Sequence, residues 1–243
     1  MTALFIAFLA LMVVALVSRY LSTRIAVRVL LGLCAWFLYA GLLGYLGILR
    51  DTSTRPPGIA FLFVPIILFL GVFVILILRS AAGARLALAF PLSIIVGVQC
   101  FRIGVELFLH QLWMVGLVPK MLSFEGANVD IYIGVSAPLI AWLSTRHRLG
   151  MKLSLTWNAL GLLSLTNVVI RAVLTAPGPF NLIHAEVPNR IIRTAPFIFI
   201  PGFFVPLAVS LHVLAIRLIL IRLRTENSEA VSVIGPGDRV AIH

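Results

Sequence analysis

Seven apolar stretches of membrane-spanning length dominate this 243-residue chain and limit the folds that it can adopt. A helix needs roughly 20 mostly apolar residues to cross the hydrocarbon core of a bilayer. Lipid offers no hydrogen-bond partners, so a spanning segment must pair its own backbone groups, as a helix does. We therefore predict an all-α membrane protein with seven transmembrane helices. They are expected at about residues 2–20, 26–49, 58–78, 86–117, 130–145, 153–175 and 194–222.

The composition agrees with lipid as the surrounding solvent. Hydrophobic residues make up 61% of the chain and charged residues 11%, and the mean hydropathy is +1.13. A soluble domain does not hide so large an apolar fraction. Residues 1–224 contain no long hydrophilic block and are expected to form a single transmembrane domain. Residues 225–243 are polar and are predicted to be a disordered cytoplasmic tail.

The basic residues indicate the orientation of the chain. The net charge is +11, but the basic residues are spread through the loops, which favours phospholipid headgroups rather than nucleic acid as their partners. Eleven of them flank the expected spans on one side: Arg19, Arg24, Arg28, Arg79, Arg85, Arg146, Arg148, Lys152, Arg217, Arg222 and Arg224. Five lie on the other side: Arg50, Arg55, Lys120, Arg190 and Arg193. Cytoplasmic loops carry the excess of basic residues, so the N-terminus is expected outside and the C-terminus in the cytoplasm.

Three ionisable residues stand four apart inside the fourth stretch: Arg102, Glu106 and His110. At 3.6 residues per turn, this spacing places all three side chains on one face of a helix. Ionisable groups inside the membrane are costly and usually mark a functional site, where they pair with each other or face a polar cavity. With the predicted orientation, this face lies in the outer half of the membrane.

The loop that follows this stretch is the most polar of the expected outer loops and contains Glu125, Asn128 and Asp130. Asp130 stands near the start of the fifth stretch, where a carboxylate also serves to cap a helix. Asn167 and Arg171 are four apart in the sixth stretch and are expected at a similar depth. These residues either line an outward-facing cavity or form an ion-pair network, in which Arg102 or Arg171 neutralises Glu106.

Two kinds of chemistry fit a functional cavity. In the first, Glu106 and His110 share a proton beside Asp130, so that these three are the candidate catalytic residues of an acid–base enzyme. In the second, arginine side chains bind a carboxylate or phosphate. The candidate ligand-binding residues are Arg102, Arg171, Asn167, Glu125 and Asn128.

Two further histidines and one glutamate are candidates for contact with this site. His184 and Glu186, in the last outer loop, are able to close over it. His212 is expected in the cytoplasmic half, too deep to join the cluster, and hydrogen-bonded to a neighbouring helix. A zinc site from His110, His184 and an acidic residue lacks any supporting ligand motif, so we predict no metal and no cofactor.

Three segments carry a resemblance to a known family: FRIGVELFLHQL, GLVPKMLSFEGANVDIYIGVSAPLIAWL and LTWNALGLLSLTN. They are similar to segments of a family of bacterial seven-helix membrane proteins for which no activity is established. The resemblance implies a multi-pass protein of the bacterial cytoplasmic membrane and implies nothing about mechanism.

Three functions therefore stand open at this point. The first is binding of a lipid or another apolar or anionic small molecule in the outward cavity, with or without acid–base catalysis. The second is proton-linked transport of a small solute or anion. The third is a non-enzymatic structural or sensory role. Membrane lipids are the expected partners in all three cases, and the sequence predicts no oligomeric state.

Overall fold

The computed structural model describes residues 2–50, 56–146, 148–178 and 180–233, and all of the regular structure in these ranges is helical. The α-helices are α1 (Thr2–Tyr20), α2 (Thr23–Tyr45), α3 (Ala60–Arg79), α4 (Ala81–Leu88), α5 (Leu92–Gly97), α6 (Phe101–Met114), α7 (Asp130–Leu143), α8 (Arg148–Leu174) and α9 (Val205–Val233). Single 3₁₀ turns lie at Ile48–Arg50, Val98–Cys100, Lys120–Leu122 and Ile191–Arg193, and a π-helical turn, Ile200–Phe204, leads into α9. The predicted all-α class is confirmed.

Six helical segments of the described chain are long and apolar enough to cross a membrane. They are Thr2–Tyr20, Thr23–Tyr45, Ala60–Arg79, Leu92–Met114, Arg148–Leu174 and Ile200–Ser228. The expected fifth stretch corresponds to α7, an apolar helix of only 14 residues. A helix of that length reaches about 21 Å, short of the roughly 30 Å of hydrocarbon core.

Two of the expected spans begin six residues later in the structure than the sequence predicted. The fourth begins at Leu92 and not at residue 86, because Pro91 ends the preceding turn and residues 81–88 form the separate helix α4. The last begins at Ile200, six residues later than expected. Residues 225–233 continue α9 as helix, and residues 234–243 of the predicted tail lie outside the described residues.

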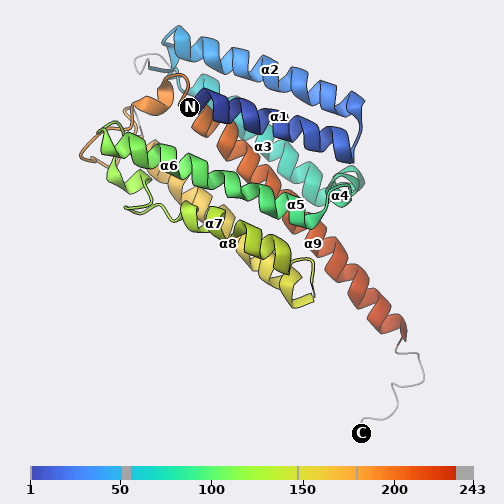
Figure 1. The fold of residues 1–243 in the computed structure, drawn as a ribbon. Coiled ribbons are helices and arrows are strands. Elements are labelled where there is room, and N and C mark those ends of the chain that lie inside the picture. Colours follow the sequence, from blue (N-terminus) through green and yellow to red (C-terminus); the bar gives the residue numbers. More distant parts are fainter. Residues whose placement is uncertain (1, 51–55, 147, 179, 234–243) are drawn as a thin grey trace.

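The long helix α9 runs through the middle of the bundle (Figure 1). It contacts α3 and α4 on one side and α5 and α8 on the other, while α1 packs on α2 and α7 packs between α5, α6 and α8. Loops and short turns gather at one end, which contains residues 115–129 and which we call the loop end. The last turns of α9 extend beyond the opposite end, which we call the tail end.

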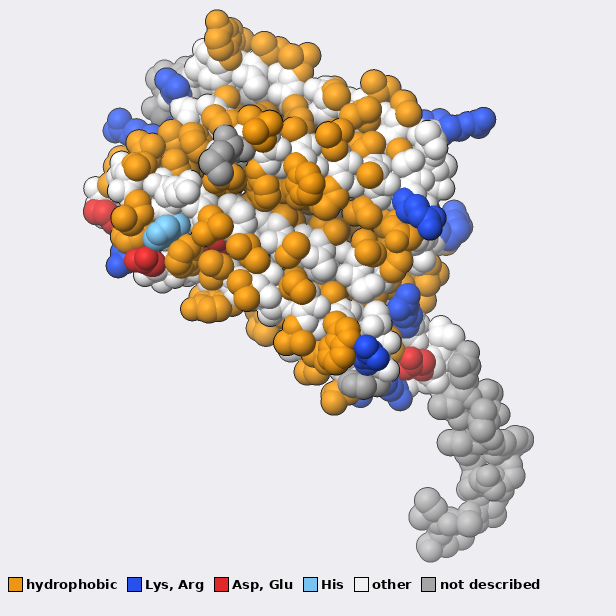
Figure 2. Space-filling view, viewed as in Figure 1, with side chains coloured by type: hydrophobic (Ala, Val, Ile, Leu, Met, Phe, Trp, Pro, Cys, Tyr) orange, Lys and Arg blue, Asp and Glu red, His pale blue; other side chains and the backbone are white. Residues whose placement is uncertain are grey.

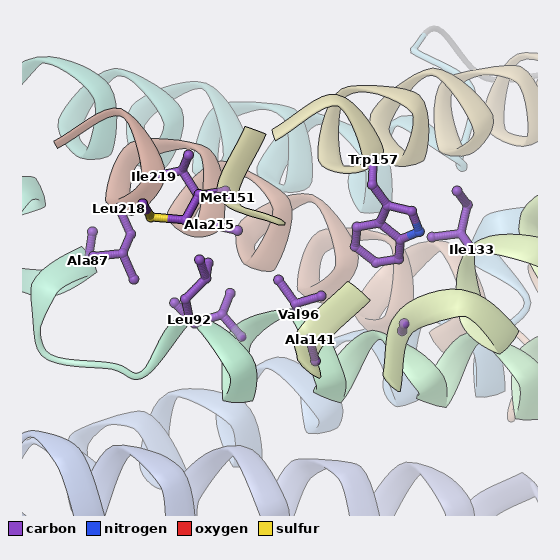
Figure 3. Packing of buried hydrophobic residues seen from close by; sticks show 12 residues of the cluster. Ala87, Leu92, Val96, Ile133, Ala141, Met151, Trp157, Ala215, Leu218 and Ile219 are labelled. Atoms are coloured by element: carbon purple, nitrogen blue, oxygen red, sulfur yellow. The ribbon is translucent and has the colours of Figure 1, made fainter. Parts of the chain in front are cut away.

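On the face shown in Figure 2, apolar side chains cover the bundle between its ends, and basic side chains lie towards the two ends. This is the distribution expected of a protein whose sides face lipid and whose ends face headgroups and water. Interior apolar clusters hold the helices together. One of them joins Leu92 and Val96 of α5 to Ala141 of α7, Met151 of α8 and Leu218 of α9 (Figure 3).

Candidate functional site

An ion pair between Arg102 of α6 and Asp130 of α7 lies in the interior of the bundle. The Nε of Arg102 donates to Oδ2 of Asp130 at 2.8 Å, and its Nη2 pairs with Oδ1 of the same carboxylate. Ser164 of α8 donates to Asp130 Oδ1 at 2.5 Å. Arg102 and Asp130 are only 2% and 5% exposed, so the pair is shielded from solvent. A two-pronged contact of this kind is strong and fixes the relative positions of both side chains.

The same guanidinium also reaches α9. Nη1 of Arg102 lies 2.8 Å from Nε2 of His212, and Nδ1 of His212 lies 2.8 Å from Oδ1 of Asn158 in α8. Arginine has no acceptor atom, so His212 Nε2 must carry the lone pair and Nδ1 the proton. Asn158 Nδ2 donates to the carbonyl of Ser154 at 2.7 Å, which leaves its Oδ1 as the acceptor facing His212. The contacts therefore specify a neutral His212 protonated on Nδ1.

Close packing of α8 against α9 accommodates this imidazole. A Cβ atom at Gly161 would lie 2.3 Å from Cε1 of His212, a distance that real Cβ contacts do not reach. The carbonyl of Gly161 is also 3.5 Å from Arg102 Nη2. The glycine therefore lets the two helices approach while His212 stays fully buried between them.

Glu106 lies one helical turn from Arg102 and has a different partner. Nδ2 of Asn128, in the loop before α7, donates to both carboxylate oxygens of Glu106 at 2.8 and 2.7 Å and to the carbonyl of Leu122 at 2.9 Å. Oδ1 of Asn128 accepts from the backbone N–H of Asp130 at 3.0 Å. Glu106 and Asn128 are each 1% exposed. Asn128 therefore joins the two buried carboxyl groups of this region.

Together these contacts form one continuous chain of buried polar side chains from four helices and a loop. Its members, which we call the buried polar network, are Arg102, Glu106, Asn128, Asp130, Ser154, Asn158, Ser164 and His212. Along α8 it extends from Ser164 to Ser154, ten residues or about 15 Å. Among the described residues, Arg102 is the one arginine or lysine that bonds to a member, and it pairs with Asp130. Glu106 has no cation partner within the part of the chain that the structure describes.

The remaining predicted residues lie around this network. His110 is 3.3 Å from the hydroxyl of Ser123 and 3.9 Å from Glu125 Oε1, and its ring stacks on Phe124. Among the described side chains, no hydrogen bond joins His110 to Glu106. The expected Glu106–His110 proton-sharing pair is therefore not formed in this structure, and His110 contacts the loop that covers Glu106.

Arg171 does not neutralise Glu106. Its Nε donates to Oδ1 of Asn167 at 2.8 Å, and Nδ2 of Asn167 donates to the carbonyl of Ala127 at 3.2 Å. These two residues therefore tie α8 to the loop that contains Asn128. The expected alternative, an ion pair between Arg102 and Glu106, is not formed either, because the guanidinium of Arg102 binds the carboxylate of Asp130.

The expectation that His212 lies too far away to join the cluster was wrong, because its Nε2 lies 2.8 Å from Nη1 of Arg102. The last apolar helical segment is Ile200–Ser228 instead of 194–222, and His212 lies near its middle. The prediction that His212 hydrogen-bonds a neighbouring helix is confirmed, with Asn158 as the partner. Asn158 and Ser154 were not among the predicted site residues. Their signal is a run of small or polar residues at helical spacing on α8, namely Ser154, Asn158, Gly161 and Ser164.

Glu186, in the last loop at the loop end, does not cover the network. Glu186 accepts a hydrogen bond from the backbone N–H of Lys120 at 2.6 Å, and His184 is exposed. Arg193 is buried and donates to the carbonyl of Pro177, and burial lowers the pKa of its guanidinium from the usual value.

The structure places a cleft at the tail end, away from the network. It has a volume of about 540 Å³ and lies between α7, α8 and α9. No member of the buried polar network lines it. Within the described ranges, no group of three or more His, Cys, Asp or Glu side chains is placed to hold a metal ion.

A family model for a domain of unknown function, DUF8737, matches residues 56–220. The chain belongs to this family. The DUF8737 segment contains every member of the buried polar network, from Arg102 to His212, and it excludes α1 and α2. No curated protein and no solved structure matches the chain significantly.

Proposed function

We propose that this protein is a proton-linked transporter of a small solute or anion, in which Glu106 exchanges the proton. The observation that carries the proposal is the position of Glu106 in the buried polar network. It is 1% exposed, its carboxylate oxygens are held by Asn128, and the neighbouring cation Arg102 is bound to Asp130. Ionisable groups that meet inside a membrane bundle are typical of proton-coupled transport.

Asn128 supplies the link between a proton on Glu106 and the rest of the site. An ionised carboxylate only accepts, which matches the two bonds from Asn128 Nδ2. A protonated Glu106 has an O–H that needs an acceptor, but Asn128 presents its Nδ2 to Glu106 and its Oδ1 to the N–H of Asp130. Oδ1 can reach the new O–H only if the amide turns, which takes it away from the N–H of Asp130. Proton uptake would therefore alter the start of α7 and, through Asp130, the contact with Arg102.

The network is closed at both ends in this conformation, as transport by alternating access requires of an occluded state. At the loop end, Leu112, Val118 and Leu122 form a buried apolar cluster. At the tail end, the apolar cluster that contains Met151 and Leu218 joins α7, α8 and α9 (Figure 3), and no member of the network lines the cleft. We infer that the loop of residues 115–129 opens the site on one side and that movement of α9 opens it on the other.

The proposal includes a topology of seven crossings. Helix α7 would be the seventh, since it packs among α5, α6 and α8 and its buried Asp130 lies at its first turn. The excess of basic residues at the tail end supports an N-terminus outside and a C-terminus in the cytoplasm. The proposed location is the bacterial cytoplasmic membrane, in agreement with the resemblance described above.

The other two functions remain predictions with less support from the geometry. Acid–base catalysis with Glu106, His110 and Asp130 requires groups that are free to react, whereas Asp130 bonds to Arg102 and Ser164. An outward lipid-binding cavity requires an opening at the loop end, where Glu106 is covered. A purely structural role accounts for the Arg102–Asp130 pair but gives no reason for a second buried carboxyl without a cation.

The test uses full-length protein in liposomes that contain a trapped pH-sensitive dye. A pH gradient is imposed and a panel of carboxylates, inorganic phosphate and quaternary amines is added in turn. We expect at least one solute to drive proton flux, which Glu106→Gln abolishes. The matched control Glu125→Gln removes a carboxylate from the loop surface and should retain the flux. Glu106→Asp keeps the carboxyl and should retain part of it.

Two results would remove the proposal. One is the absence of solute-dependent proton flux for every solute in the panel. The other is flux in Glu106→Gln equal to that of the unmodified protein.

A further inference from the structure

The cleft at the tail end has a basic rim and an apolar floor. It lies where α7 ends, α8 begins and α9 leaves the bundle. The polar side chains of its lining are Ser144, Thr145, Arg146, Arg148, Arg222, Thr225 and Glu226. Its apolar side chains are Leu88, Met151 and Ile221.

The charges of the rim are unbalanced. Three arginines face one glutamate, and Nε of Arg148 lies 3.6 Å from Oε2 of Glu226, which accounts for that acidic residue. Arg148 also donates to Asn227. The guanidinium of Arg146 lies over the ring of Trp142, 4.7 Å from its centre. Among the described residues, neither Arg146 nor Arg222 forms an ion pair with a carboxylate.

The hydroxyl groups of the rim already donate hydrogen bonds, so among the described residues Arg146 and Arg222 remain as its donors without a protein acceptor. Ser144 donates to the carbonyl of Ala141 and Thr145 to that of Trp142, both at 2.8 Å. Thr225 donates to the carbonyl of Ile221 at 3.2 Å. A ligand of this rim therefore meets arginine donors, and arginine favours anions whose oxygens match its planar fork, phosphate above all.

We propose that this cleft binds a phosphate group, supplied by an anionic phospholipid headgroup or by a soluble phosphate. Arg146, in the turn between α7 and α8, and Arg222, in α9, would contact the phosphate oxygens from opposite sides. Arg148 would stay with Glu226 and limit the net charge of the rim. Leu88, Met151 and Ile221 favour the lipid, because they offer an apolar surface to the chains beside the headgroup.

The surface view agrees with such a site. Basic side chains, with an acidic one among them, lie where α9 leaves the bundle, directly beside the apolar belt (Figure 2). Basic pockets between helices at the membrane surface are typical binding places of anionic lipid headgroups. The site is separate from the buried polar network and does not depend on the proposed transport.

The test measures binding to the full-length protein in neutral detergent, with Trp fluorescence as the signal. The probes are short-chain phosphatidylglycerol, short-chain phosphatidylcholine and inorganic phosphate. We expect saturable binding of phosphatidylglycerol, at least about tenfold tighter than that of phosphatidylcholine, because the choline group adds a positive charge beside the arginines. If inorganic phosphate displaces phosphatidylglycerol at similar concentration, the ligand is a soluble phosphate. If it does not, the ligand is the lipid.

Two variants on the same helix decide whether the cleft itself is responsible. Arg222 lines the cleft, whereas Arg224 is exposed and lies outside it, so Arg222→Gln and Arg224→Gln remove the same charge at different places. We expect Arg222→Gln to weaken binding about tenfold and Arg224→Gln to leave it unchanged. Arg146→Gln should weaken binding as Arg222→Gln does. Equal losses in Arg222→Gln and Arg224→Gln, or no saturable binding of any anionic probe, would overturn the proposal.

Discussion

Arg102 and Asp130 form a two-pronged ion pair across α6 and α7, and the same guanidinium touches His212 of α9. One side chain thereby fixes the relative positions of three helices. Removal of one partner from a buried pair leaves the other charge without compensation, which is far more costly than loss of an exposed pair.

The first prediction concerns this pair. Asp130→Asn should lower the free energy of unfolding by about 3–5 kcal/mol, because it leaves the buried Arg102 unpaired. The double variant Arg102→Met/Asp130→Leu should be less destabilised than Asp130→Asn, since no uncompensated charge remains. Both are measured by denaturant titration in detergent micelles. If the double variant loses more stability than Asp130→Asn, the ion pair is not what holds these helices.

The second prediction compares Arg102 with Arg171. Arg102→Gln should be strongly destabilising, whereas Arg171→Gln should cost about 1 kcal/mol, because Arg171 is only partly buried and makes one hydrogen bond, to Asn167. The same unfolding titration compares them. Equal losses of stability would mean that Arg171 belongs to the network after all.

The third prediction concerns the helix contact at Gly161. Gly161→Ala should destabilise the protein by about 1–3 kcal/mol, because its Cβ atom would collide with the ring of His212. Gly32→Ala in α2 is the matched control, since nothing lies within 4 Å of a Cβ atom there. Thermal unfolding of the two variants gives the comparison. A Gly161→Ala variant as stable as Gly32→Ala would contradict the packing described for His212.

The fourth prediction is the tautomer of His212. Nitrogen NMR of histidine-labelled protein at neutral pH should show a neutral imidazole with its proton on Nδ1. The signal is assigned to His212 because it should be missing from the spectrum of His212→Gln. The reason is that Arg102 can only donate to Nε2. A spectrum with the proton on Nε2 would mean that Arg102 and His212 are not in contact.

The fold could be predicted from the sequence far better than the site. Apolar runs of spanning length form helices, because in lipid the backbone N–H and C=O groups of a single segment find hydrogen-bond partners only within a helix. The boundaries were less predictable: Pro91 divides one run, and the last span starts at Ile200. That shift of six residues, about 9 Å along a helix, brings His212 to near the middle of its segment, which the predicted boundaries did not allow for.

The partners inside the site could not be predicted, because they depend on the rotation of each helix. Spacing alone placed Arg102, Glu106 and His110 on one face. It could not show that Arg102 turns to Asp130 while Glu106 turns to Asn128. The role of Asn128 combines bonds to Glu106, Leu122 and Asp130, and only the path of the loop brings these together.

The most direct test of the central claim is infrared difference spectroscopy of the purified protein as the pH is stepped between acid and alkaline values. Proton exchange at Glu106 should produce a band from the carbonyl stretch of a protonated carboxyl group in a buried setting. The account predicts that this band disappears in Glu106→Gln and persists in Glu125→Gln. A Glu106→Gln spectrum identical to that of the unmodified protein would show that Glu106 exchanges no proton, and would contradict the account.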